Sequence, residues 1–160
     1  MQKFPFFPNL QYNLSIDKID IVKLLIDNRI NINTQDKYGF SSLMCCCKYN
    51  IKNQKSMIKI LIQNNANVNL KTYKNKNNAL MILCKNITSD DVKCIKIFFK
   101  YNISYNQLNK NKLSALDILM TTNRNKLNIA SYLNKIIKFK NLGIYHEIYP
   151  EYKNIIDFKI

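Results

Sequence analysis

One apolar pattern occurs three times in the chain, and its spacing decides the fold. The copies are residues 21–26 (IVKLLI), 57–62 (MIKILI) and 94–99 (CIKIFF), each with lysine in third place. They begin 36 and 37 residues apart. A regular period of this length is the signature of an array of structural repeats, in which each unit packs on its neighbours. The sequence therefore predicts a repeat protein.

Each copy is followed by two further segments at constant distances. Directly after it comes a polar phrase, which reads NRININ at 28–33, NNANVN at 64–69 and YNISYN at 101–106. Ten or eleven residues after the end of each phrase begins a second apolar stretch: 43–47 (LMCCC), 80–84 (LMILC) and 116–120 (LDILM). We interpret each unit as two short helices and a polar loop.

These residues resemble the ankyrin repeat, whose pattern runs D-x-x-G-x-T-P-L-H and ends in G-A-D-V-N. Residues 36–44 match it best, with Asp36, Gly39 and Leu43 as they stand and Ser41 for threonine. In the third unit Tyr73 takes the Asp place and Lys76 the Gly place. Residues 114–116 stand for T-P-L in the fourth. The resemblance covers about residues 4–138.

The resemblance implies an all-α, ankyrin-like helical repeat solenoid of about four helix-turn-helix units with short hairpin loops. We place the units at about 1–33, 34–69, 70–106 and 107–138, which together form the repeat domain 1–138. The degenerate first unit is expected to act as an N-terminal cap. The last unit is expected to end in a shorter second helix around residues 129–133, and the apolar segment 139–160 is predicted to be a C-terminal cap.

Composition narrows the class of protein. The chain contains only two glycines and three prolines. This scarcity of turn residues disfavours a β-sandwich or β-barrel and leaves no glycine-rich phosphate-binding loop. The net charge of +15 would attract phosphates, yet only Arg29 and Arg124 of the 25 basic residues are arginines, which nucleic-acid sites usually favour. Lysine, asparagine and isoleucine all have AT-rich codons, which is a simpler source of the charge. Nucleic-acid binding stays an alternative.

Several sequence features bear on location and source. No window approaches about 18 uninterrupted apolar residues and no secretory signal is evident, so we expect an intracellular, cytoplasmic monomer without a membrane partner. The Lys/Asn/Ile-rich composition, with L-M-x-x-C in place of L-H-x-A-A, looks similar to ankyrin proteins of giant DNA viruses. For a viral protein, the host cytoplasm would be the location.

Candidate catalytic and metal-binding residues form no constellation. On a helix Cys45, Cys46 and Cys47 point in three directions and cannot share one ion. Cys46, Cys47 and Cys84 are predicted to pack in the core, whereas Cys45, at a variable place, is expected to reach the surface. His146 is the only histidine. We therefore predict no enzyme, with no catalytic residue, metal or cofactor.

The resemblance implies a protein-protein interaction module that binds an unidentified partner protein through a concave face of hairpin tips and first helices. Tyr38 and Phe40 are predicted to be anchors, because exposed aromatics concentrate interface energy and neither has an evident place in the stack. The predicted partner-binding residues are Gln35, Lys37, Tyr38, Phe40, Lys48, Tyr49, Lys74, Asn75, Asn77, Lys85, Asn86, Lys110, Asn111, Leu113, Thr121 and Thr122.

Two other functions remain open. Lys23, Lys59 and Lys96 are predicted to form a row on the outer face of the second helices, either as a solvated face or as a track for nucleic acid or an acidic partner. The tail residues Tyr149, Pro150 and Glu151 with Ile155 and Ile156 faintly match the F-box-like ends of some viral ankyrin proteins. Such an end would make the protein a viral ubiquitin-ligase adaptor.

Overall fold

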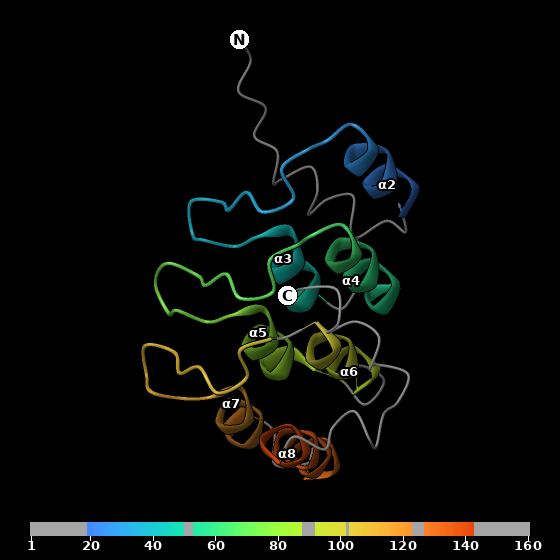
Figure 1. The fold of residues 1–160 in the computed structure, drawn as a ribbon. Helices are drawn as coiled ribbons and strands as arrows, with labels where there is room; N and C mark the ends of the chain where they lie inside the picture. The colour runs from blue at the N-terminus through green and yellow to red at the C-terminus, as the bar shows by residue number, and fades with distance from the viewer. Residues whose placement is uncertain (1–18, 50–52, 88–91, 102, 123–126, 143–160) are drawn as a thin grey trace.

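The computed structural model describes residues 19–49, 53–87, 92–101, 103–122 and 127–142, which form seven helices and no strand. The helices are α2 (Ile19–Asp27), α3 (Ser42–Lys48), α4 (Gln54–Gln63), α5 (Ala79–Asn86), α6 (Val92–Lys100), α7 (Ala115–Thr122) and α8 (Leu127–Asn141). Helices α3, α5 and α7 stack in one column and α2, α4 and α6 in a second (Figure 1). This is the all-α repeat solenoid that the resemblance implied.

The first helix of each unit begins at a residue in the threonine place of the repeat pattern. Ser41 Oγ accepts a hydrogen bond from the Met44 N–H, at 3.4 Å, and Asn78 Oδ1 accepts one from the Met81 N–H, at 3.0 Å. Ser114 Oγ accepts the Asp117 N–H at 3.2 Å. Each bond satisfies a backbone donor that the first turn of a helix would otherwise leave unmade, so these side chains define where the helices start.

The core lies between the two columns and surrounds most of the first helices α3 and α5. Residues 42–47 of α3 and 79–84 of α5 are all buried. The expectation that Cys45 reaches the surface was therefore wrong, because its exposed fraction is 1%. The second helices instead have one buried and one solvated face, as Leu61 at 2% exposure and the exposed Lys59 show on α4.

Three hairpins join the columns, and we call them the first finger (residues 31–41), the second finger (67–78) and the third finger (103–114). Each turns through a residue with left-handed backbone: Gly39 (φ 84°), Lys76 (φ 56°) and Lys112 (φ 58°). Glycine is the residue that adopts this conformation without a steric penalty. The structure confirms that Lys76 occupies the glycine place of its unit.

The aspartate place of the third unit belongs to Thr72, and its assignment to Tyr73 was wrong. In the first finger, Asp36 Oδ1 accepts the N–H groups of Tyr38 and Phe40, both at 2.8 Å. Thr72 does the equivalent in the second finger, where its Oγ1 accepts the Asn77 N–H at 3.1 Å. The one-residue insertion of this finger lies within residues 72–77, so Tyr73 moves to the tip.

Helix α8 differs most from its expected form. It runs for 15 residues, from Leu127 to Asn141, and is the longest of the described helices, so a short second helix was the wrong prediction. Ile129, Leu133 and Ile136 are buried along it, and this helical spacing continues to the half-buried Phe139. Residues 139–141 therefore belong to the last repeat helix and not to a separate cap.

The two predicted caps fall mostly outside the described residues. Residues 1–18 of the degenerate first unit lie outside the described ranges. Residues 143–160, which include His146 and the tail segment compared with F-box-like ends, also lie outside them. Within the part of the chain that the structure describes, none of the helices combines the length and the apolar character needed to span a bilayer.

Candidate functional site: the finger surface

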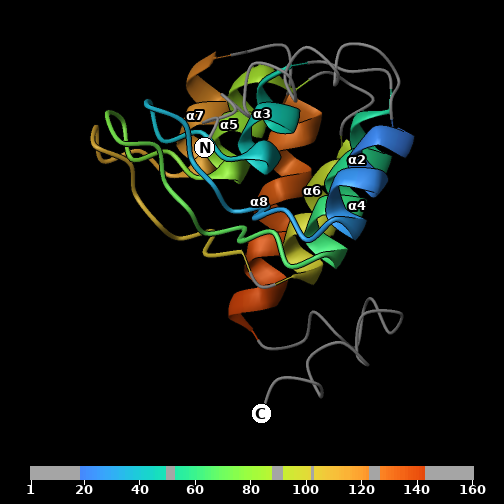
Figure 2. The same cartoon turned by 90° about the horizontal axis from the view of Figure 1, so that it is seen from above.

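The three fingers lie side by side and project from the column of α3, α5 and α7, away from the second helices (Figures 1 and 2). We call the exposed tips of the fingers, with the adjoining carboxyl end of α3, the finger surface. Its exposed residues are Lys37, Tyr38, Lys48, Tyr49, Tyr73, Lys74, Lys76, Lys110 and Lys112. Six of these nine were predicted to bind a partner: Lys37, Tyr38, Lys48, Tyr49, Lys74 and Lys110. Tyr73, Lys76 and Lys112 were not.

Hydrogen bonds tie neighbouring fingers together. The Tyr73 N–H donates to the Tyr38 carbonyl at 3.0 Å, and the Lys110 N–H donates to the Asn75 carbonyl at 2.9 Å. Side chains add a second link at each step: Gln35 Nε2 donates to the Lys71 carbonyl at 3.0 Å, and Asn109 Nδ2 donates to Asn77 Oδ1 at 2.9 Å. The fingers are therefore one continuous surface. Gln35 and Asn77, predicted to contact a partner, use their side chains to hold it together.

Tyrosine and lysine side chains alternate on this surface. Tyr38 is 61% exposed, Tyr73 53% and Tyr49 41%. The Lys37 ammonium lies 5.1 Å from the centroid of the Tyr38 ring. The Lys48 ammonium lies 4.8 Å from the Phe40 ring and 5.1 Å from the Tyr49 ring. At these distances a cation is attracted to the face of an aromatic ring, so the lysines and rings restrain one another.

Phe40 does not fit its predicted role as a fully exposed anchor. It is half-buried and packs against the core, and so is Leu113, the residue that follows the turn of the third finger. Both directly follow a left-handed turn residue, where the chain returns toward the first helix. The expectation that Phe40 has no place in the stack was wrong, and Tyr38 is the more exposed of the two predicted anchors.

The other predicted contact residues differ in how available their side chains are. Lys85, Asn75 and Asn111 are exposed. Asn86 is also exposed but donates from Nδ2 to the Ile82 carbonyl at 2.8 Å. Thr121 Oγ1 donates to the Asp117 carbonyl at 2.9 Å. The side chain of Thr122 lies outside the described residues.

The predicted lysine row on the second helices is only partly formed. Lys23 and Lys59 are exposed, whereas Lys96 is half-buried and its ammonium lies 5.6 Å from the centroid of the Tyr132 ring on α8. One of the three cations thus packs against the next helix, so a continuous solvated track would be interrupted at α6.

Three buried thiols and one carboxylate at a helix start have shifted pKa values. All five cysteines of the chain are buried. Burial raises the pKa of the Cys84 thiol to about 12 and also raises those of Cys46 and Cys47, so these thiols remain protonated at neutral pH. The hydroxyl and N–H of Ser114 lower the pKa of Asp117, whose carboxylate they bond at the start of α7. Over the described ranges, no three His, Cys, Asp or Glu side chains come close enough to share a metal ion.

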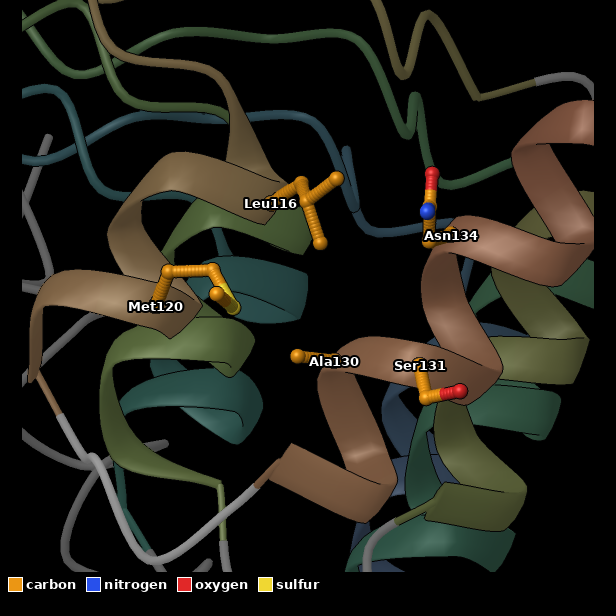
Figure 3. Close-up of a pocket in the computed structure, with 5 residues that line it drawn as sticks. All are labelled: Leu116, Met120, Ala130, Ser131 and Asn134. Carbon is orange, nitrogen blue, oxygen red and sulfur yellow. The ribbon is translucent and has the colours of Figure 1, made fainter.

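A hollow of about 390 Å³ lies between α7 and α8, at the end of the stack (Figure 3). Its walls are Leu116 and Met120 from α7 and Ala130, Ser131 and Asn134 from α8. None of these side chains titrates. Leu116 and Met120 hold the places that Leu80 and Cys84 hold in α5, where α7 packs on the preceding helix. The α7 side of the hollow is therefore formed by residues at stacking positions of the repeat.

A family model described as "Ankyrin repeats (3 copies)" matches residues 10–72. No curated protein matches the chain. The stacked helix pairs make the fold an all-α repeat solenoid, and the match shows that residues 10–72 are similar to ankyrin repeats. Ankyrin repeats are generally protein-protein interaction modules and are typically not enzymes.

Proposed function

We propose that this chain is a non-enzymatic interaction module that binds a partner protein through the finger surface and the adjoining first helices. The observation that carries the proposal is the pairing of the first two fingers. The Tyr73 N–H bonds the Tyr38 carbonyl, and both tyrosines expose more than half of their side-chain surface. Two exposed aromatics therefore stand next to each other on hydrogen-bonded backbone.

Such an arrangement suits recognition for an energetic reason. Tyrosine offers a large amphipathic contact area and is enriched among residues that dominate interface energies. A surface whose backbone is already ordered loses less conformational entropy when a partner binds. The fingers are ordered before binding by bonds such as that from Gln35 to the Lys71 carbonyl. Among the described residues, no three His, Cys, Asp or Glu side chains are grouped so that they could hold a metal ion.

The decisive experiment is affinity purification of the tagged full chain from its native cell, followed by mass spectrometry. The test variant is Tyr38→Ala with Tyr73→Ala, which removes exposed rings and leaves Phe40 in its packing. We expect it to abolish partner capture while the helical circular dichroism signal persists. The control variant replaces Lys23, Lys59 and Lys96 by glutamine, and we expect it to retain capture. Capture that survives the tyrosine variant and fails with the lysine variant would refute the proposal.

That reversed result would favour nucleic acid, the alternative that the net charge of +15 supports. Removal of phosphate-contacting lysines would then weaken binding. Each lost contact would also reduce the slope of the logarithm of the binding constant against the logarithm of the salt concentration by about one unit. Binding to heparin or DNA near physiological salt is the simple assay. The ubiquitin-ligase alternative depends on tail residues outside the described ranges, and failure to retain the ligase adaptor would remove it.

We further propose that the protein acts in the cytoplasm, which would be that of the host if the chain is viral. Two features support this location: the composition similar to giant-virus ankyrin proteins, and five buried cysteines in the thiol form, which suit a reducing compartment. Fluorescence imaging of a tagged full chain checks it, and accumulation in the secretory pathway would contradict it.

A further inference from the structure

The finger surface carries positive charge with almost nothing to oppose it. The three fingers, residues 31–41, 67–78 and 103–114, contain six lysines and a single acidic residue, Asp36. The Asp36 carboxylate is already engaged, because its Oδ1 accepts the N–H groups of Tyr38 and Phe40. In the other two fingers the equivalent place is held by neutral side chains, Thr72 and Asn109, which make the same kind of bond. The second and third fingers therefore keep the hydrogen bond that stabilises the turn but have no negative charge at this position.

Two of the finger lysines occupy positions where lysine is conformationally unfavourable. Lys76 and Lys112 have φ values of 56° and 58°, and glycine would adopt this backbone without strain, as Gly39 does in the first finger. Both side chains are exposed. A strained backbone conformation is a pointer to function when the side chain makes no packing contribution that would explain it. Here the strained residues place cations at the tips of two neighbouring fingers.

The aromatic rings of this surface are arranged less well for stacking on nucleobases. The Lys37 ammonium occupies one face of the Tyr38 ring, and the Lys48 ammonium lies over both Phe40 and Tyr49. The Tyr73 ring rests on Gly39, where an added Cβ would lie 2.8 Å from its Cδ1 atom. Stacking uses an open ring face, whereas these rings already have one face covered.

We propose that the finger surface recognises an acidic segment of a partner protein, whose carboxylates bind the lysines of the three fingers while its apolar side chains contact Tyr38 and Tyr73. This inference rests on the proposed function and names the chemical class of the partner. The charge is complementary, and the tyrosines supply the apolar contact that charge alone does not give. Lysine, as a compact point charge, pairs readily with single carboxylates without the fork geometry that arginine brings to phosphates and bases.

The test uses fluorescence anisotropy with labelled probes and the full chain. One probe is a peptide of glutamate, glycine and leucine, the second is the same peptide with glutamine for each glutamate, and the third is an oligothymidylate of equal length. The finger variant is Lys37→Gln, Lys74→Gln and Lys110→Gln, one lysine from each finger. The matched control is Lys23→Gln, Lys59→Gln and Lys93→Gln on the second helices. All six lysines are exposed, and both variants lose the same charge.

We expect the glutamate peptide to bind more tightly than the other two probes at physiological salt and to weaken as salt rises. Three exposed charge pairs together are worth about tenfold in affinity, so the finger variant should lose about tenfold. The control variant should change by less than about twofold. Equal losses in both variants would mean diffuse attraction to the net charge and would overturn the inference.

Two further outcomes would also overturn it. Tighter binding of the oligothymidylate would assign the surface to nucleic acid, and equal binding of the glutamate and glutamine peptides would remove the role of carboxylates. A captured partner that depends on Tyr38 and Tyr73 but is not weakened by the finger variant would leave the proposed function standing and refute only its acidic chemistry.

Discussion

Asn33 Oδ1 accepts a hydrogen bond from the backbone N–H of Asn67 at 2.7 Å, across the boundary between two repeat units. The same side chain donates from Nδ2 to the Asn65 carbonyl at 3.1 Å. The next unit repeats the first of these bonds, because Asn69 Oδ1 accepts the Ser104 N–H at 2.8 Å. The last asparagine of the first and of the second polar phrase thus links its own unit to the following one.

Replacement of Asn33 by alanine should weaken that link. Two backbone groups of the next unit lose their partner, and we expect the free energy of unfolding to fall by about 1–2 kcal/mol. Urea unfolding followed by circular dichroism measures the change. Gln63→Ala, at the exposed end of α4, is the control and should cost less than about 0.5 kcal/mol. Equal costs would show that the asparagine link contributes nothing to stacking.

Leu61→Ala tests the packing of the second helices. Leu61 is 2% exposed in α4, whose neighbours include α3 and α6. Truncation of a buried leucine leaves a cavity, and we expect a loss of about 2–5 kcal/mol. Lys59→Ala on the exposed face of the same helix should cost little. If both variants were equally destabilised, the assignment of buried and solvated faces would be wrong.

The finger turns predict opposite effects of glycine and alanine. Gly39→Ala places a Cβ 2.5 Å from the Tyr73 nitrogen at a φ of 84°, so the chain must shift, at a cost of about 1–3 kcal/mol. Lys112→Gly removes strain at a φ of 58° but also raises the conformational entropy of the unfolded chain. The net result should be an increase of about 0.5–1 kcal/mol in the free energy of unfolding. Thermal unfolding compares the two variants. A more stable Gly39→Ala variant would contradict the close contact between the first two fingers.

The buried cysteines predict slow reaction with thiol reagents. Since burial raises the pKa of Cys46, Cys47 and Cys84, their protonated form persists as the pH rises from about 7 to 9, where an exposed thiol would ionise. The folded chain should therefore react slowly with an aromatic disulfide reagent throughout that range, and all five thiols should react once urea unfolds it. One fast-reacting thiol in the folded protein would contradict the burial of all five cysteines.

The repeat architecture was predictable because its signals are local and recur. A buried leucine at 61, helix starts at Ser41 and Ser114, and lysine in the glycine place at residue 76 all follow from patterns within about a dozen residues. Each copy of the pattern supports the reading of the others. The match of residues 10–72 to a family model of ankyrin repeats agrees with that periodicity.

The arrangement of the finger surface was decided by tertiary structure. Gln35 and Asn77 look like exposed contact residues in the sequence, yet their partners lie 36 and 32 residues away on the next finger. Tyr73 could hold the aspartate place or the tip, and only the bonds of Thr72 to Asn77 resolve the register of a finger with one extra residue. Cys45 is likewise buried by neighbours that no local pattern identifies. The sequence determined which segments become helices and turns, because propensity, capping and periodicity act over short distances. Which polar side chains bind a neighbour and which face solvent depended on contacts that exist only once the units have stacked.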